Sequence, residues 1–178
     1  MENVVLVNEN DEQVGVMEKM EAHRKALLHR AFSVFIFNDK GDMLLQQRAK
    51  NKYHSGGLWT NACCSHPFPG EDILIGAERR LKEELGFTTS LRKLFDFIYK
   101  SGFENGLTEF EFDHVFVGYY NSSIFPNDNE VSDYCFMNME EIEASLKNHP
   151  EKFTAWFHIV WPRIKEWQQK HNFQKTAS

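Results

Sequence analysis

The chain has few of the features that mark membrane-bound, secreted or nucleic-acid-binding proteins. Only 3 of its 178 residues are cysteine, an odd number with two of them adjacent, which argues against a disulfide framework. No basic segment followed by an apolar run opens the chain, and no apolar run approaches the length of a membrane span. Acidic residues exceed basic ones, which gives a net charge of −6 and no general basic face. We therefore expect a cytoplasmic protein with no membrane and no nucleic acid among its partners.

The composition is that of one ordinary globular domain. Hydrophobic residues make up 42% of the chain and charged residues 26%, without repeats or low-complexity segments. A length of 178 residues suits one well-filled core, so we expect a single domain over residues 1–178. The 16 phenylalanines favour a core that includes an apolar internal pocket. The modest size, without heptads or an exposed apolar stripe, favours a monomer.

Several runs of β-branched and aromatic residues predict strands, because turn-forming residues separate them. The runs at 31–37 and 43–48 flank the turn at 38–41 and predict the clearest hairpin of the chain. The predicted strands are residues 4–7, 14–17, 31–37, 43–48, 95–100, 108–119 and 131–136.

Helical periodicity is clearest over residues 73–85. Apolar residues recur there every four positions as one buried stripe, and Gly86 is placed to end the helix. A second helix is predicted after the cap residues Asn138 and Glu141, and a closing helix over residues 153–171. These elements predict an α+β fold in which helices pack on a mixed sheet.

Acidic residues gather at the end of the first predicted helix. Neighbouring carboxylates repel one another and a hard divalent cation removes that repulsion, although a solvated helix face usually explains a pair of glutamates. Here the spacing also matches the Nudix box, a motif that binds Mg²⁺ and a diphosphate. The matching residues are Glu71, Arg79, Leu81, Glu83, Glu84 and Gly86.

The box departs from its usual form at two positions. Ser65 stands where the box normally opens with glycine, and Arg80 stands where a glutamate normally follows the box arginine. A guanidinium among the box carboxylates would weaken metal-assisted hydrolysis and strengthen anion binding. The sequence therefore keeps a diphosphate-binding motif while compromising its hydrolytic part.

A second group of carboxylates lies on the strand predicted for 108–119. Glu109 and Glu111 are two residues apart and share one face of the strand, whereas Phe110 and Phe112 point the other way. Polar alternation on a half-exposed strand explains this pattern without function. The functional interpretation is a pair of oxygen ligands, or one ligand and one acid/base group.

Histidines and one of two adjacent cysteines supply further candidates. His23, His29 and His66, with two carboxylates, would suit Mn²⁺, Mg²⁺ or Zn²⁺, although a single histidine is more often structural. Adjacent thiols on an extended segment point to opposite faces, and Cys64 shares its side with His66. Cys64 is therefore preferred over Cys63 for chemistry. The remaining histidines are interpreted as ordinary: His54, His114, His149, His158 and His171.

Taken together, these segments resemble the type I isopentenyl-diphosphate Δ-isomerases, a Nudix-fold family. With Trp156 near its end, the likeness covers nearly the whole chain, and the segment 64–67 together with the altered box is its most specific part. The resemblance implies a Nudix-type α/β/α sandwich with a mixed sheet. The segments that carry it are residues 28–33, 47–48, 59–67, 79–86 and 109–111.

The resemblance also implies a role for each candidate residue. Cys64 would be the catalytic thiol and Glu111 the opposing acid/base group, assisted by Tyr99, while Trp156 would face the hydrocarbon. Without the resemblance, Trp156 is a core residue and Tyr99 a strand-edge aromatic. The first metal, Mn²⁺, Zn²⁺ or Mg²⁺, would bind His23, His29, His66, Glu109 and Glu111, and a diphosphate-bridging Mg²⁺ would bind Glu84. The diphosphate would contact Lys19, Arg48, Lys52 and Arg80, which are otherwise solvated surface groups.

The implied reaction interconverts isopentenyl diphosphate and dimethylallyl diphosphate for isoprenoid biosynthesis. It delivers a proton to one end of an alkene and removes another from a nearby carbon, so two groups on opposite faces of a dry pocket suit it. The side of Glu111 and Tyr99 is favoured as donor and Cys64 as acceptor, with the opposite assignment left open. The alternatives are a Nudix-type diphosphate hydrolase and a non-catalytic binding member of the fold.

Overall fold

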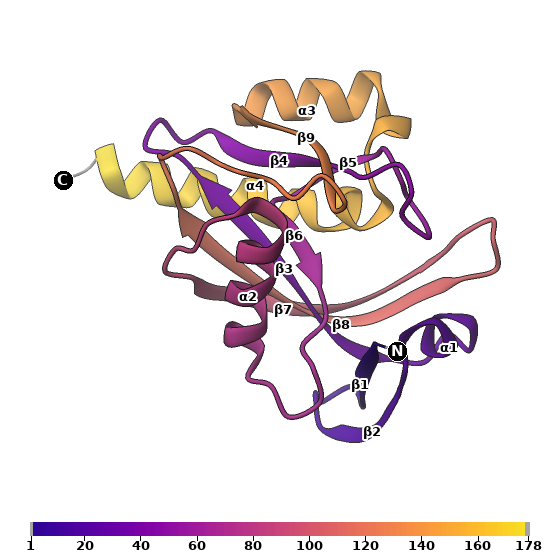
Figure 1. Ribbon diagram of the computed structural model, residues 1–178. Coiled ribbons are helices and arrows are strands. Elements are labelled where there is room, and N and C mark those ends of the chain that lie inside the picture. Colours follow the sequence, from indigo (N-terminus) through magenta and orange to yellow (C-terminus); the bar gives the residue numbers. More distant parts are fainter. Residues whose placement is uncertain (1, 177–178) are drawn as a thin grey trace.

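The protein folds around one mixed β-sheet that carries helices on both faces (Figure 1). The computed structural model describes residues 2–176, with side chains described as far as residue 171. The strands are β1 (Asn3–Val7), β2 (Gln13–Glu18), β3 (His29–Phe37), β4 (Met43–Arg48), β5 (Trp59–Thr60), β6 (Cys63–Ser65), β7 (Arg92–Gly102), β8 (Thr108–Tyr119) and β9 (Val131–Met137). The helices are α1 (Lys19–Arg24), α2 (Ile73–Leu85), α3 (Met139–Asn148), a 3₁₀ turn (Pro150–Lys152) and α4 (Ala155–Thr176).

The strand β3 organises the sheet. It pairs in parallel with β8 along its whole length, from His29 beside Glu111 to Phe37 beside Tyr119. On its other edge it pairs antiparallel with β6, where Cys64 lies opposite Ser33. β7 extends the sheet beyond β8, and β4 carries β5 and β9. These pairings bring together segments that lie far apart in the sequence.

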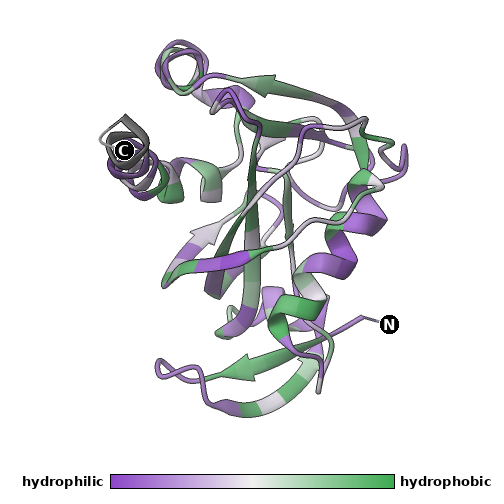
Figure 2. Ribbon diagram, turned by 90° about the vertical axis from the view of Figure 1, so that its left-hand side faces the viewer, coloured by the Kyte–Doolittle hydropathy of each residue, from purple (hydrophilic) through white to green (hydrophobic). Residues whose placement is uncertain are grey.

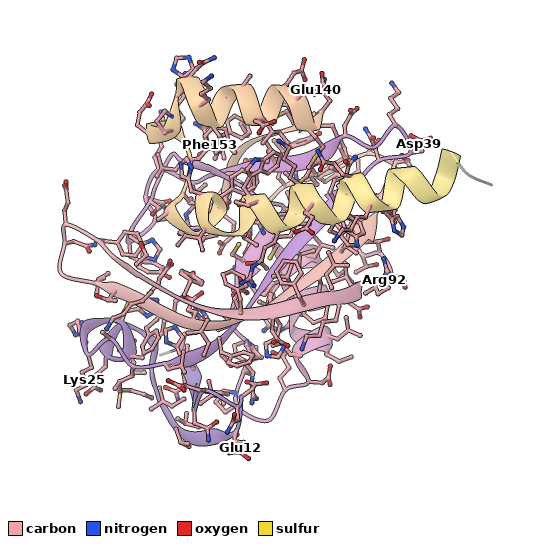
Figure 3. The ribbon with its side chains drawn as sticks, turned by 180° about the vertical axis from the view of Figure 1, so that it is seen from behind. Glu12, Lys25, Asp39, Arg92, Glu140 and Phe153 are labelled. Atoms are coloured by element: carbon pink, nitrogen blue, oxygen red, sulfur yellow. The ribbon has the colours of Figure 1, made fainter. Side chains whose placement is uncertain are left out.

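Alternation along β3 divides the core into two layers, because successive strand side chains point to opposite faces. Phe32, Val34 and Ile36 pack beneath α2, whereas Phe35 and Phe37 pack with α3 and α4. Figure 3 shows α4, in yellow, lying across the face opposite α2 with α3 beside it. Hydrophobic residues accordingly concentrate in the central strands between the helices (Figure 2). The predicted α+β sandwich with a mixed sheet is confirmed.

Most elements lie where the sequence predicts them. The ranges 43–48, 73–85 and 108–119 coincide with β4, α2 and β8. The side chain of Asn138 caps α3 in a capping box with Glu141, as predicted. The closing helix α4 continues through Pro162 and begins two residues after the predicted start at 153.

The predicted hairpin of 31–37 with 43–48 is wrong beyond its turn. The turn forms, with Gly41 in the left-handed region, but β3 and β4 share only the pair Phe37 and Met43. The two strands diverge because β6 and β8 occupy the edges of β3, while β4 pairs with β5 and β9. The sequence analysis also missed α1, β5 and β6, which are two to six residues long.

Gly70 and Gly86 have similar positive φ angles but different surroundings, so alanine substitutions at the two positions show how closely the end of α2 packs. Gly86 ends α2 with φ +76°, and a Cβ there would lie 2.3 Å from the carbonyl oxygen of Phe125. Gly70 has φ +82° with no neighbour within 4 Å of an added Cβ. We predict that Gly70→Ala lowers the free energy of unfolding by about 1–2 kcal/mol, from backbone conformation alone. Gly86→Ala adds a backbone clash and loses about 1–3 kcal/mol more. Equal losses in urea unfolding would contradict this packing.

Candidate active site

A cavity of about 460 Å³ lies beside the β3–β8 pair and collects most of the predicted site residues. Its walls come from the end of β4, the loop before β5, the strands β6, β7 and β8, the helix α2 and the first turn of α4. His23 and His29 lie outside its lining. The predicted residues that line it are Lys19, Arg48, Lys52, Cys64, His66, Arg80, Glu84, Tyr99, Glu109, Glu111 and Trp156.

Four buried side chains form a compact donor group at one side of this cavity. His23 comes from the last turn of α1, His29 from the start of β3, His66 from the segment after β6, and Glu111 from β8. One donor atom of each lies within 4.8 Å of the others. The parallel register of β3 and β8 sets His29 directly beside Glu111, so the sheet itself assembles half of the group.

The imidazoles of this group are oriented as metal ligands. Nδ1 of His23 lies 2.7 Å from the carbonyl oxygen of Lys19, and Nδ1 of His29 lies 2.8 Å from that of Leu27. A carbonyl only accepts, so each Nδ1 carries the proton, and Nε2 is the atom of each neutral ring that can bind a metal. Both Nε2 atoms are buried and have no hydrogen-bond partner. Burial lowers the pKa values of His23 and His66 to about 4, so both rings are neutral at pH 7. This donor set suits a divalent metal ion.

Glu109, predicted as a ligand of the same metal, belongs to a second donor group. Its carboxylate lies with His23 and His54, again within 4.8 Å of one another, and all three residues are buried. His54, interpreted as ordinary from the sequence, lies within this second group. Nothing in the sequence marks His54, because it lies in the irregular loop before β5 and reaches Glu109 only through the fold.

The two carboxyl groups on β8 occupy different electrostatic environments. Burial alone would raise the pKa of Glu111, but the hydrogen bond with His66 Nε2 at 3.1 Å and the nearby ring of His29 outweigh it and hold that pKa well below its ordinary value. Burial and the neighbouring charge of Glu111 raise the pKa of Glu109 well above its ordinary value. The hydroxyl oxygen of Tyr99 lies 2.7 Å from Glu111 Oε2 and 3.1 Å from Glu109 Oε2. The pKa values of the two neighbouring carboxyls are therefore shifted in opposite directions, with the Tyr99 hydroxyl between them.

Cys64 faces the cavity with its thiol held by polar neighbours. Its Sγ donates to Asn61 Oδ1 at 3.0 Å and lies 3.5 Å from Ser33 Oγ, which donates to Asp113 Oδ2 at 2.7 Å. Burial, with the nearby Asp113 carboxylate, raises the pKa of the Cys64 thiol. The sequence analysis missed Ser33, Asn61 and Asp113, since only strand register brings two of them to Cys64. Cys63 points to the other face, where it lies buried against Glu84.

Arg80 binds the acidic residues that the Nudix box supplies. Its guanidinium donates to Glu83 Oε2 and Glu84 Oε1, both at 2.7 Å, and to Glu130 Oε2 at 3.3 Å. The second oxygen of Glu84 accepts from Gln46 Nε2 at 2.8 Å. The carboxylates that could hold a cation are thus partly neutralised by a side chain of the same helix.

The remaining predicted phosphate contacts also line the cavity. Lys19 pairs with Glu2 at 3.1 Å, and Lys52 pairs with Glu130. The guanidinium of Arg48 lies 5.1 Å from the ring centre of Trp156, whose indole is buried. Cationic groups therefore line one part of the cavity and the indole of Trp156 another.

Comparison with known proteins places this site in a family. Residues 27–157 match the model of the NUDIX domain. The chain is 49% identical to an isopentenyl-diphosphate Delta-isomerase of Pectobacterium atrosepticum, over 97% of both chains. It is 41% identical to one of Aliivibrio fischeri, over 96% of this chain and 99% of that one. The chain belongs to the isopentenyl-diphosphate Delta-isomerase family.

Solved structures support the fold of this isomerase family member. A crystal structure from Deinococcus radiodurans matches with a TM-score of 0.77 at 23% identity, covering 91% of this chain and 98% of that one. A MutT protein from Methanosarcina mazei matches with a TM-score of 0.63 at 21% identity, covering 82% and 95%. In the part of the chain that the structure describes, no helix has the length and apolarity needed to cross a bilayer.

The first donor group can be tested by metal binding alone. Glu111→Gln removes its single charge while keeping the shape of the side chain. We predict that Zn²⁺ affinity, measured by competition with a chromophoric chelator, falls at least about tenfold. Glu104→Gln, in the exposed turn before β8, is the matched control and should bind Zn²⁺ as the unaltered protein does. Equal affinities for the two variants would show that Glu111 is not a ligand.

Proposed function

We propose that this enzyme interconverts isopentenyl diphosphate and dimethylallyl diphosphate in the cavity, by adding one proton and removing another. The observation that carries the proposal is one cavity lined by the Cys64 thiol, by the Tyr99–Glu111 pair and by basic side chains. A 1,3-shift of a double bond needs such a donor and acceptor, held away from water. The close similarity to isopentenyl-diphosphate Delta-isomerases supports the same reaction. We place the reaction in isoprenoid biosynthesis, carried out by a monomer in the cytoplasm.

Cys64 and Glu111 are the proposed proton-transferring groups, with Tyr99 assisting. In this structure the raised pKa of Cys64 keeps its proton on sulfur, and the lowered pKa of Glu111 leaves a carboxylate. The direction favoured from the sequence has the side of Glu111 and Tyr99 as donor and Cys64 as acceptor, with these two groups in exchanged protonation states. The opposite direction uses the same two groups, since the reaction is reversible. Trp156 offers a π face to developing positive charge, without a nucleophile.

Two metal sites accompany this chemistry in our proposal. His23, His29, His66 and Glu111, with Glu109 nearby, would hold Zn²⁺, Mn²⁺ or Mg²⁺, and Glu84 would hold the Mg²⁺ that bridges to the diphosphate. When bound, such ions supply fixed positive charge beside Glu111 and the phosphates.

Basic side chains would anchor the diphosphate and so fix the hydrocarbon between the two reacting groups. Lys19, Arg48, Lys52 and Arg80 all line the cavity. The present partners of Lys19 and Lys52 are the carboxylates of Glu2 and Glu130, which a diphosphate would replace. Binding energy from this remote group would hold the alkene in place for proton transfer.

Hydrolysis of a diphosphate is the less favoured alternative. Arg80 ion-pairs with the box residues Glu83 and Glu84, which in a hydrolase would hold metal and activate water. The paired guanidinium lowers the negative charge available to a metal there.

The activity is tested by proton NMR of isopentenyl diphosphate in D₂O with Mg²⁺. We expect dimethylallyl diphosphate carrying deuterium, without release of phosphate. Cys64→Ala should slow turnover by about 10²–10⁴-fold, since it removes a proton-transferring group. Cys135→Ala, a change of the same chemistry on β9, should leave the rate unchanged. Full activity of Cys64→Ala would refute the thiol assignment, and phosphate release would favour the hydrolase.

Ser33 is a proposed positioning residue for the Cys64 thiol, because it bridges that thiol to buried Asp113. Ser33→Ala removes this hydrogen bond, worth about 0.5–1.5 kcal/mol, and should lower kcat up to about tenfold while KM stays constant. The rate of Cys64 alkylation by iodoacetamide should change as well, which loss of stability alone would not cause. Ser90→Ala, on an exposed loop, serves as control. An unaltered kcat and alkylation rate would remove Ser33 from the mechanism.

A further inference from the structure

His54 lies beside the metal centre in a position that the proposed function does not use. Its Nε2 is 3.1 Å from Glu109 Oε1, and both residues are buried. Although the two atoms are close, Nε2 makes no well-aligned hydrogen bond and has no other partner among the described residues. A buried imidazole nitrogen aimed at a carboxylate without a hydrogen bond between them is the arrangement expected of two ligands facing one ion.

The ring of His54 is held in this orientation by its neighbours. It stacks on Phe103 at 4.4 Å with an interplanar angle of 11°, and the ring of Tyr53 meets it edge-on at 4.3 Å. Nδ1 lies 3.2 Å from the hydroxyl oxygen of Ser55, which can donate to it or accept from it. Because these contacts engage the ring and Nδ1, Nε2 is the atom left for Glu109 and for an ion.

His23 joins this pair and connects it to the first donor group. One donor atom each from His23, His54 and Glu109 lies within 4.8 Å of the others. His23 has only one nitrogen to offer, since its Nδ1 faces the carbonyl oxygen of Lys19 at 2.7 Å. Its Nε2 is therefore common to both groups, and one lone pair binds one ion at a time.

We propose that His23, His54 and Glu109 form a second position for a divalent transition metal, beside the first and sharing His23 with it. Two imidazoles and one carboxylate suit Zn²⁺ or a similar borderline ion, and three protein donors leave coordination positions open. Since His54 and Glu109 line the cavity, the open positions face the place where substrate would bind. The two positions are alternatives for one ion, because they share His23.

The second position should bind more weakly than the first. It has three protein donors against four. The cation of Arg48 also acts on both His54 and Glu109, and a positive charge nearby opposes a second one. The unaltered protein should therefore hold its ion mainly in the first position, and the second becomes measurable when the first is weakened. This inference rests on one part of the proposed function, the binding of a metal ion in the first position, and does not depend on the isomerisation reaction.

The test weakens the first position and asks whether His54 then carries the ion. Zn²⁺ affinity is measured for His66→Ala, for His66→Ala combined with His54→Ala, and for His66→Ala combined with His114→Ala. His114 is a buried histidine outside both groups and controls for loss of an imidazole. We expect His66→Ala to retain one weaker Zn²⁺ site. Removing His54 as well should lower that affinity at least about tenfold further, and removing His114 should not.

A direct readout identifies the ligand atom. In His66→Ala loaded with ¹¹³Cd²⁺ and labelled with ¹⁵N-histidine, we expect scalar coupling between cadmium and Nε2 of His54. Should His66→Ala fail to fold, Glu111→Gln weakens the same first position and takes its place in every measurement. Absence of the coupling, or equal effects of the His54 and His114 changes, would overturn the second position while leaving the first intact. Failure of the unaltered protein to bind Zn²⁺ or Cd²⁺ would overturn both, whereas the NMR assay of isomerisation tests the reaction separately.

Discussion

The parallel pairing of β3 with β8 is the constraint on which the site depends. Its register sets His29 beside Glu111, and the same strands bring Ser33 near Asp113. The antiparallel addition of β6 to the other edge of β3 then places Cys64 opposite Ser33. A shift of one residue would turn every one of these side chains to the opposite face of the sheet. The apolar alternation that fills both layers of the core therefore also fixes the positions of the polar groups.

Burying so many titratable groups at one place is costly, and the structure offsets the cost by pairing them. The hydrogen bond with His66 compensates Glu111, and those with Asn61 and Ser33 compensate Cys64. The compensation is incomplete at the Nε2 atoms of His23, His29 and His54, which remain without hydrogen bonds. Unpaired nitrogen atoms within each donor group are the strongest physical sign that an ion belongs to the folded state, since its binding would stabilise that state.

The sequence predicts what depends on local periodicity and misses what depends on strand register. The helix α2, its terminating glycine and the shared face of Glu109 and Glu111 follow from spacings of two to four residues. The preference for Cys64 over Cys63 follows from the alternation of an extended segment. By contrast, His54 approaches Glu109 across 55 residues of chain, and Ser33 reaches Asp113 across 80. No local pattern encodes such pairs, so the family resemblance could supply some site residues but not these.

The hairpin predicted for residues 31–37 and 43–48 does not form because long-range strand pairing decides the partners of β3, and this has a consequence for the site. Residues 31–37 and 43–48 have the composition and the turn of a two-stranded ribbon, yet β4 leaves β3 after a single pair. Had they paired fully, β4 would compete with β6 for an edge of β3, and Cys64 would lose its place opposite Ser33. Local propensity is overruled here by the larger burial available to the complete sheet.

The altered Nudix box shows how one fold can separate two kinds of diphosphate chemistry. The box helix α2 still presents Glu83 and Glu84 at its end, but Arg80 pairs with both and with Glu130. The guanidinium therefore partly neutralises the carboxylates that in a hydrolase would hold metal. The same guanidinium adds to the attraction for phosphate. The groups proposed for proton transfer lie instead on β6 and β8, one strand to either side of β3. In the proposed mechanism the chemistry thus lies on the sheet and not on the helix, so that the diphosphate would serve as an anchor and the hydrocarbon would face the thiol and the carboxylate.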